Sequence, residues 1–548
     1  MASRRRKHVK TSRAVPGPVV LPFLERHGQA IAVVLVLIGS VRIAATYTAF
    51  NQTIDEPGHI ACGMEWLDKH TYNYFPEQPP LGRVAAALGP YLLGIRSQGS
   101  PRSDLIEVSA EGAAILYRGH HYFLTLSAAR LGILPFFWIA CLVVYAFAKR
   151  SHGGAVAAIA VFLFSFLPPV LAHSGLATTD MALTAFLGAA FVTAVRWWEQ
   201  PTMKYAALFG ASTGLAVLSK FSSLVFFPAA VAVLLIGYAV LDRPKLAAVA
   251  GMVNDRLPSF LVAALTGAAL IAAGYRFSLA ELFNGIRMLT THNAEGHPTY
   301  LLGRHSMTGF WYFYPVTLAV KTPLAFLALL GLAVAWALPR RDRLRRDWPA
   351  LALVTGILGT ALFSHINIGV RHILPVHIGF SLLAAGAVAE MLKRTPTQPW
   401  ARIGLAALLF WFAGSSLLCH PDYLAYCNEL AGSQPEKILA DSDLDWGQDT
   451  KRLAQRLREL GARQVSFNPF SMTDFPDELG LPRIVPSNAI SPAPGWNAVS
   501  LSYWKTRRMG LIDTHPEITP WPDLVPPGER VGKGIMLWYV RPNAASPR

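Results

Sequence analysis

The chain has 548 residues, of which 53% are hydrophobic and only 15% are charged, and its mean hydropathy is +0.35. Because about 25% of the residues of a soluble domain are charged, this composition excludes an ordinary soluble protein and indicates a large surface in lipid. The formal net charge is +16, but the basic residues lie between apolar runs, which excludes a continuous basic face for nucleic acid.

Several apolar runs are long enough to cross a membrane, since a spanning helix needs about 20 mostly apolar residues. They lie near 29–48, 124–148, 154–172, 178–197, 203–219, 222–241, 257–275, 311–338, 349–365, 371–392 and 402–419. The chain is therefore predicted to form a polytopic α-helical membrane bundle of about 11 transmembrane helices. The runs at 203–219 and 349–365 are the shortest, so the number of spans depends most on them.

Lysine and arginine residues in the short loops predict the orientation, because cytoplasmic loops carry an excess of positive charge. The N-terminal stretch is strongly basic, and every second loop after it is basic too, whereas the alternate turns at 173–177 and 364–372 contain only Arg371. We therefore predict a multi-pass protein of the plasma (inner) membrane with a cytoplasmic N-terminus and an extracytoplasmic C-terminal part.

This orientation predicts three parts of the chain: a basic cytoplasmic N-terminus at 1–28, a transmembrane domain at 29–420 with large outer loops at 49–123 and 276–310, and a small extracytoplasmic α/β domain at 421–548. The last part has no run long enough to span. Its periodicity predicts a helix at 451–460 and strands at 464–467, 498–503 and 535–540.

Two acidic positions follow predicted spans or begin them on the outer side. Asp55 and Glu56 stand directly after the first span, with His59 close behind, and Asp180 begins the fourth span. A carboxylate beside a membrane span is costly unless it is solvated or functional, and here it would serve as a general base for an acceptor hydroxyl. The alternative for both aspartates is helix capping.

Three cations on the outer side suit a phosphate ligand. Lys220 lies in the tight turn between the fifth and sixth spans, Arg371 in another outer turn, and Arg83 in the first outer loop. A lysine at an outer turn opposes the positive-inside bias, so we expect a bound anion to hold it. The alternative is a lysine whose charged end reaches the membrane interface.

The outer histidines have no tight metal-ligand spacing, so no cofactor is predicted with certainty, and a divalent cation stays an open alternative. The stretch Asp441–Gly447 is rich in aspartate, like a calcium loop. Trp446 stands where such a loop needs glycine, and Arg452 where it needs glutamate. A capped turn before the predicted helix is favoured instead.

Taken in order, the motifs resemble those of the GT-C superfamily of polyprenyl-phosphate-sugar-dependent glycosyltransferases, and within it the bacterial protein O-mannosyltransferase and aminoarabinose transferase group. The motifs are Asp55-Glu56-Pro57, Glu77 to Gly82, Thr178-Thr179-Asp180, Gly214-Leu215 with Ser219-Lys220, Trp311 to Pro315, Lys321-Thr322-Pro323, Gly369 to Pro375, His420 to Tyr426 and Asp441 to Gln448.

The resemblance implies a GT-C membrane bundle with amphipathic helices in the first outer loop, expected near 82–94 and 107–117. It implies a sugar donor carried on a polyprenyl phosphate and an inverting displacement at the sugar carbon. The implied catalytic residues are Asp55, as the base, with Asp180 and Glu56. The implied ligands of the donor phosphate are Lys220, Arg371 and Arg83, and the implied substrate-binding residues are His59, Tyr312 and His372.

One departure concerns the sugar. The aminoarabinose branch often has Glu-Lys-Pro where this chain has Glu77-Gln78-Pro79, so a phosphate-binding lysine of that branch is absent, and Arg83 or Arg371 would replace it. The expected partners are the lipid-linked sugar, membrane lipids and an acceptor protein, lipid or glycan, without nucleic acid.

Two alternatives to an enzyme are a polyprenyl-lipid transporter or flippase and a non-catalytic membrane scaffold. A transporter favours repeated halves and broken helices near the bilayer midplane, whereas the sequence has no internal repeat. The candidate charges also gather on one predicted side, which favours the enzyme.

Overall fold

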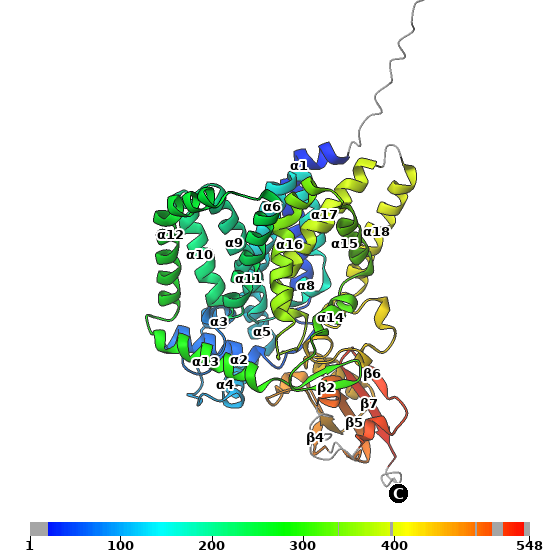
Figure 1. The fold of residues 1–548 in the computed structure, drawn as a ribbon. Coiled ribbons are helices and arrows are strands. Elements are labelled where there is room, and N and C mark those ends of the chain that lie inside the picture. Colours follow the sequence, from blue (N-terminus) through cyan, green and yellow to red (C-terminus); the bar gives the residue numbers. More distant parts are fainter. Residues whose placement is uncertain (1–19, 338, 395–397, 488–489, 507–518, 542–548) are drawn as a thin grey trace, which may run out of the picture.

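A computed structural model of the protein describes residues 20–337, 339–394, 398–487, 490–506 and 519–541. Most of the predicted basic N-terminus therefore lies outside the described residues. Long helices stand side by side in a bundle, and a small sheet lies at one end of it (Figure 1). We call this end the sheet end.

Seven helices of the described residues are long and apolar enough to cross a membrane, or up to nine spans if two bent helix pairs count as one span each. The seven are α1 (Val20–Ala44), α5 with α6 (Tyr122–Leu131 and Leu134–His152), α9 (Asp180–Glu199), α11 (Ser223–Asp242), α12 (Leu246–Gly274), α17 (Val376–Arg394) and α18 (Pro399–Leu418). The predicted membrane helix bundle is thus confirmed.

Prolines break the two bent pairs. Helix α7 (Gly154–Ser165) ends before Pro168, which begins α8 (Pro168–Ser174), and the two helices meet at 68°. Pro323 separates α14 (Phe313–Lys321) from α15 (Leu324–Ala337), which meet at 117°. A proline cannot donate the backbone hydrogen bond that would continue a helix.

The predicted number of about 11 spans stays a prediction. Helix α10 (Met203–Ser219) has 17 residues, and α16 (Arg341–Ala361) begins with a charged turn, so neither meets the length and composition expected of a span. These two helices correspond to the two shortest apolar runs of the sequence.

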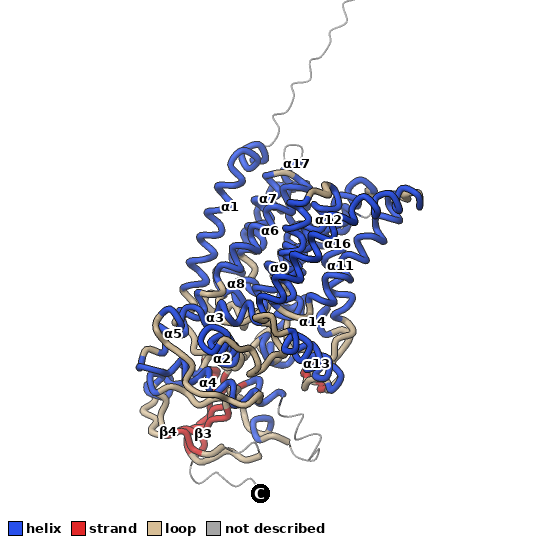
Figure 2. The backbone as a smooth tube through the Cα atoms, turned by 90° about the vertical axis from the view of Figure 1, so that its left-hand side faces the viewer, coloured by secondary structure: helices blue, strands red, loops and turns tan. Residues whose placement is uncertain are grey.

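Short helices lie across the sheet end of the bundle (Figures 1 and 2). They are α2 (Glu56–Met64), α3 (Pro80–Leu92), α4 (Leu105–Tyr117) and α13 (Leu279–Glu295). Helices α3 and α4 confirm the two helices predicted in the first loop. A side chain at Gly112 would approach the carbonyl oxygen of Pro57 to 1.8 Å, so α4 packs directly on α2 and fixes the helix that follows Asp55.

The C-terminal part contains a five-stranded sheet in the order β4-β3-β5-β7-β6, in which β3 runs parallel to β4 and β5 and the other pairs are antiparallel. Helix α19 buries Leu453 and Leu457 against the sheet. The elements are α19 (Thr450–Glu459), β3 (Gln464–Asn468), β4 (Arg483–Val485), β5 (Gly495–Ser500), β6 (Glu529–Val531) and β7 (Ile535–Val540). A hairpin of β1 (Thr299–Leu301) and β2 (Arg304–Ser306) is separate from the sheet.

The predicted helix and three strands of this part are confirmed, with one shift. The strand predicted at 498–503 begins and ends three residues earlier, because the chain turns into a helix after Ser500. The division of the chain at 421, and the side of the membrane on which each part lies, stay predictions.

Candidate active site

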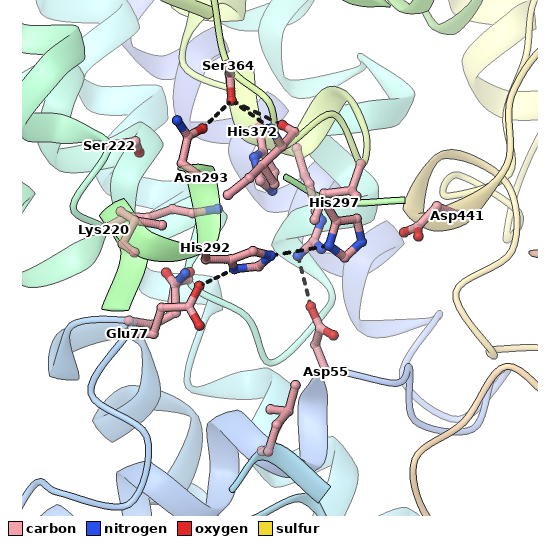
Figure 3. Close-up of a pocket in the computed structure, with 18 of the residues that line it drawn as sticks. Asp55, Glu77, Lys220, Ser222, His292, Asn293, His297, Ser364, His372 and Asp441 are labelled. Atoms are coloured by element: carbon pink, nitrogen blue, oxygen red, sulfur yellow. Dashed lines mark hydrogen bonds and ion pairs between the residues drawn. The ribbon is translucent and has the colours of Figure 1, made fainter. Parts of the chain in front are cut away.

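A cavity of about 990 Å³ opens at the sheet end, between the first loop, α13 and the C-terminal part (Figure 3). Six of the predicted site residues line it, and they come from four separate stretches of the sequence: Asp55, His59, Arg83, Lys220, Arg371 and His372. In Figure 3, the side chains of Asp55, Lys220, His372 and Asp441 surround one common space.

Four charged side chains form a row beside this cavity, and we call them the charge row: Asp55, Arg371, Asp180 and Lys220. Asp55, Arg371 and Lys220 line the cavity, whereas Asp180 is buried next to the two cations. Arg371 Nη1 lies 3.0 Å from Asp55 Oδ2 and 3.9 Å from Asp180 Oδ2. Lys220 Nζ lies 2.6 Å from Asp180 Oδ1. The Asp180 side chain is buried, whereas 29% of the Asp55 side chain is exposed. Asp55 is therefore the carboxylate of the row that a substrate can reach.

Helix capping does not account for either aspartate. Asp55 precedes the first residue of α2, but its side chain makes no capping hydrogen bond. Asp180 is the first residue of α9, and its carboxylate pairs with Lys220. Asp180 Oδ2 is buried without a hydrogen bond from any described residue. Asp55 stands at the N-cap and Asp180 in the first turn, as the capping alternative predicts, but both carboxylates form ion pairs instead of capping hydrogen bonds.

Lys220 lies in the turn between α10 and α11, as predicted, and only 9% of its side chain is exposed. A lysine that reached the membrane interface would be exposed, so that alternative is wrong. An ammonium group has three donors, and one of them binds Asp180. Since Lys220 also lines the cavity, its remaining donors are available to an anion there.

Glu56, by contrast, points into the protein and does not line the cavity. Arg130 binds it through Nε at 2.8 Å and Nη2 at 2.9 Å, and the backbone N–H groups of Thr53 and Ala177 donate to it. Burial alone would raise the pKa of Glu56, but the charge of Arg130 and these hydrogen bonds outweigh it and lower the pKa. Glu56 therefore holds the first loop in place.

Arg83 and His59 lie together on the cavity wall. Arg83 Nε donates to His59 Nδ1 at 3.2 Å, and Arg83 Nη1 donates to Tyr72 Oη at 3.1 Å. Burial, and then the positive charge of Arg83, holds the pKa of His59 well below its usual value. A neutral His59 can accept this hydrogen bond, so it contributes a polar group without adding charge.

Three further titratable side chains cross the cavity in a line: Glu77, His292 and His297 (Figure 3). His292 Nδ1 lies 2.7 Å from Glu77 Oε1, and His292 Nε2 lies 3.3 Å from His297 Nδ1. The hydrogen bond to Glu77 raises the pKa of His292, whereas burial, and then the charge of His292, lowers the pKa of His297 to about 4. A protonated His292 donates to both neighbours.

No role is predicted for these three residues from the sequence, although Glu77 begins one of the motifs that carry the family resemblance. Tyr312, predicted to bind substrate, packs on Phe310 and Trp311 and does not line the cavity. Tyr314 lines it instead. Helix α14 begins at Phe313, and two residues along a helix point to different faces.

The C-terminal part supplies one wall of the cavity, through Asp441, Trp446, Phe470, Met472 and Thr506. Burial raises the pKa of Asp441 to about 7, and the charges of Asp55 and Asp443 add to this rise against the pull of Arg371. Asp441 was missed as a site residue, because its partners come from other parts of the fold.

The aspartate-rich stretch 441–449 does not supply a side-chain cap for α19. Asp449 precedes α19, yet its carboxylate makes no capping hydrogen bond and accepts from the N–H groups of Lys533 and Gly534. The predicted capped turn is therefore wrong in its hydrogen bonding. Within the described residues, no group of three or more His, Cys, Asp or Glu side chains is arranged to hold a metal ion.

Residues 125–254 match the model of the family described as dolichyl-phosphate-mannose-protein mannosyltransferase. This match confirms the resemblance predicted from the motifs. The matched segment includes Asp180 and Lys220, which are two members of the charge row. The described residues contain seven helices that are long and apolar enough to cross a membrane, and no curated protein matches the chain.

Solved structures of ArnT from Cupriavidus metallidurans are similar to this chain at 12% identity, over 94% of this chain and 99% of that one. The TM-score is 0.49 for the apo state and 0.48 for the state bound to undecaprenyl phosphate. The archaeal oligosaccharyltransferase AglB from Archaeoglobus fulgidus, in complex with an inhibitory peptide and a dolichol-phosphate, has a TM-score of 0.46 at 14% identity, over 73% of this chain and 56% of that one.

Proposed function

We propose that this protein transfers a sugar from a polyprenyl-phosphate donor to a hydroxyl group of an acceptor on the outer side of the membrane. The observation that carries the proposal is the charge row, which places one reachable carboxylate and two cations along a single cavity. The family match, whose name includes a polyprenyl-type lipid phosphate and a transferred mannose, supports it.

Asp55 is the proposed general base. Its carboxylate lines the cavity and is partly exposed, and the ion pair with Arg371 holds it in place. A base must reach the proton that it removes. Asp55 would take the proton of the acceptor hydroxyl as its oxygen attacks the anomeric carbon, and the carbon–phosphate oxygen bond would break with inversion.

Lys220 and Arg371 are the proposed ligands of the donor phosphate. The phosphate gains negative charge as it leaves, so cations fixed beside it stabilise the transition state. Asp180 binds Lys220 at 2.6 Å and lies 3.9 Å from Arg371, and it would hold both cations in position without touching the donor. Arg83, on the same wall, would add a third positive charge.

The rest of the lining suits the lipid portion of the donor. Val225, Phe226, Leu289 and Phe363 line the cavity from α11, α13 and the end of α16. Phe363 is 83% exposed and Val225 is 56% exposed. Apolar side chains that open from a cavity to the outer surface of a membrane bundle would bind a polyprenyl chain, since its burial is favourable there.

The predicted sidedness places this cavity outside the cytoplasm, where the acceptor would be a protein, a lipid or an envelope glycan. The proposal leaves the transferred sugar open between a hexose and a pentose. Gln78 lines the cavity in place of a lysine, and its side-chain oxygen has no hydrogen-bond partner among the described residues. An amide oxygen can accept a hydrogen bond from a sugar hydroxyl, but the amide adds no positive charge.

The decisive experiment expresses the full-length chain in host membranes that are supplied with polyprenyl-phosphate sugars. Glycosylated acceptor is detected by mass spectrometry for the wild type and for Asp55→Asn. Loss of a general base lowers a rate by about 10²–10⁴, and we expect a fall of this size.

Asp474→Asn is the matched control, because Asp474 is an exposed aspartate at the same end of the molecule that does not line the cavity. It should transfer sugar at the wild-type rate. If a folded Asp55→Asn variant also keeps the wild-type rate, Asp55 is not the base. If the wild type transfers no sugar from any donor supplied, the proposed activity is wrong.

A further inference from the structure

An aspartate-rich segment, residues 441–449, is mostly buried. Its carboxylates bind backbone N–H groups of separate elements. Asp443 accepts from Val370 at 2.9 Å, Asp445 from Ser502 at 2.9 Å, and Asp449 from Gly534 at 2.8 Å. The segment is thus fixed between η3 (Val370–Ile373) and the C-terminal sheet.

This segment holds Arg371 from two sides. Arg371 Nε donates to Ser442 Oγ at 3.1 Å, and Ser442 Oγ donates to the carbonyl oxygen of Ile368. The Arg371 guanidinium carbon lies 4.1 Å from the centre of the Trp446 ring, which is within the range of a cation–π contact. A side chain at Gly369 would approach Ser442 Oγ to 2.4 Å, so this contact needs glycine there.

The same segment also holds the loop that carries Asp55. The carbonyl oxygen of Trp446 accepts from the N–H of Ile54 at 3.0 Å. Asn51 Nδ2 donates to the carbonyl oxygen of Gly447 at 2.8 Å, and Asn51 Oδ1 accepts from the N–H of Lys451 at 3.1 Å. Trp446 therefore touches both sides of the Asp55–Arg371 ion pair, through its ring and through its backbone.

A second carboxylate competes for Arg371. Asp180 Oδ2 lies 3.9 Å from the same Nη1 that binds Asp55, and it is buried without a hydrogen bond from the described residues. A buried carboxylate oxygen without a partner is costly, so a shift of Arg371 towards Asp180 would be favourable if nothing opposed it. The ion pair of Arg371 with Asp55 opposes this shift, and so do the contacts of Arg371 with Ser442 and Trp446.

We propose that the aspartate-rich segment is part of the active site, with Trp446 and Ser442 as positioning residues that hold Arg371 against Asp55. This inference rests on the proposed function only in assigning roles to Asp55 and Arg371. The C-terminal part therefore completes the reaction centre. Without Trp446, Arg371 turns to Asp180, the base loses its partner, and the donor phosphate loses a correctly placed cation.

The test compares Trp446→Leu and Trp446→Phe in the full-length protein. Phenylalanine keeps an aromatic face for the guanidinium, whereas leucine fills space without one. We expect Trp446→Leu to lower the transfer rate about tenfold, in the range of a desolvated cation–π contact, and Trp446→Phe to restore most of it. Both should unfold at similar temperatures, because both keep an apolar side chain there.

Trp496 provides the matched control, since it lies on β5 and packs on Tyr539 without lining the cavity. Trp496→Leu and Trp496→Phe should transfer sugar at the wild-type rate. Ser442→Ala is the second variant in case Trp446→Leu fails to fold. This substitution removes a single atom, the hydroxyl oxygen that accepts from Arg371 Nε. We expect it to lower the transfer rate too.

Binding of undecaprenyl phosphate is measured on the same proteins, so that the inference does not depend on turnover. If the wild type transfers no sugar, but Trp446→Leu binds this lipid more weakly than Trp446→Phe, the positioning of Arg371 stands and the proposed transfer is wrong. The inference is overturned if Trp446→Leu matches the wild type in both measurements, or if the leucine and phenylalanine variants fall equally.

Discussion

Two neighbouring carboxylates at the start of α2 have opposite environments. Glu56 is fully buried and receives hydrogen bonds from Arg130 and from two backbone N–H groups. Asp55 has Arg371 as its partner, keeps 29% of its side chain exposed and faces the cavity. The comparison teaches that a buried, fully paired carboxylate serves the fold, whereas a partly paired carboxylate on a cavity is available for chemistry.

The largest expected effect concerns the Glu56 side of this comparison. Arg130→Met leaves a buried carboxylate without its cation, and breaking a buried ion pair in this way costs about 3–5 kcal/mol. We expect a loss of this size in the free energy of unfolding, measured by denaturant titration in detergent. Arg102→Met is the control, because Arg102 forms an exposed pair with Glu107, and exposed pairs contribute less than about 1 kcal/mol.

The second effect concerns the Asp55 side. Arg371→Met removes a cation from the proposed transition state, so the transfer rate per folded molecule should fall by about 10²–10³. Arg371→Lys keeps the charge but loses the hydrogen bond from Nε to Ser442. Its transfer rate should lie between the rates of the wild type and of Arg371→Met. Arg456→Met, which changes an exposed arginine of α19, should not change the rate. If Arg371→Met and the wild type transfer sugar at equal rates, Arg371 does not stabilise the transition state.

A third, smaller effect depends on pH. It tests whether Asp441 is a partly paired carboxylate on the cavity, like Asp55, or a fully paired one, like Glu56. Its pKa of about 7 in the folded protein lies above its ordinary value of 3.8. The folded state therefore binds more protons than the unfolded state between these values, and the contribution of Asp441 to stability is lost as the pH rises through about 7.

Asp441→Asn removes this titration and keeps the acceptor for the N–H of Ser442. Asparagine also tolerates the left-handed backbone of this position, where φ is 58°. Melting temperatures are compared at about pH 5 and about pH 8. The variant should gain stability relative to the wild type as the pH rises, whereas Asp474→Asn should not. A constant difference would show that Asp441 does not titrate in this range.

The smallest expected effect concerns Tyr312. The family resemblance predicts a substrate-binding role, whereas the structure places its side chain outside the cavity lining. Tyr312→Phe should therefore leave the Michaelis constant for the donor unchanged. Tyr314→Phe removes a hydrogen bond to the carbonyl oxygen of Ile366 on the cavity wall, and it should raise that constant. The reverse order would restore the prediction from the sequence.

Much of the local structure could be predicted from the sequence alone. The apolar runs predicted the membrane helices, the turn at Lys220 lies where it was expected, and the helix at α19 and the strands β3 and β7 match their periodicity. These features depend on short stretches of chain, because the spacing of apolar residues shows which face of an element is buried. Because a span is predicted from the length of its apolar run, the two shortest runs were the least certain spans.

The tertiary structure alone decided which charged groups became partners. Asp55 and Arg371 are 316 residues apart, and Glu56 finds its cation 74 residues away. No local pattern distinguishes the two acids of one dipeptide, since the direction of each side chain is set when α2 packs on α4. Other contacts also join elements that meet only in the folded bundle. They are the hydrogen-bonded line of Glu77, His292 and His297, and the contact of Trp446 with Arg371.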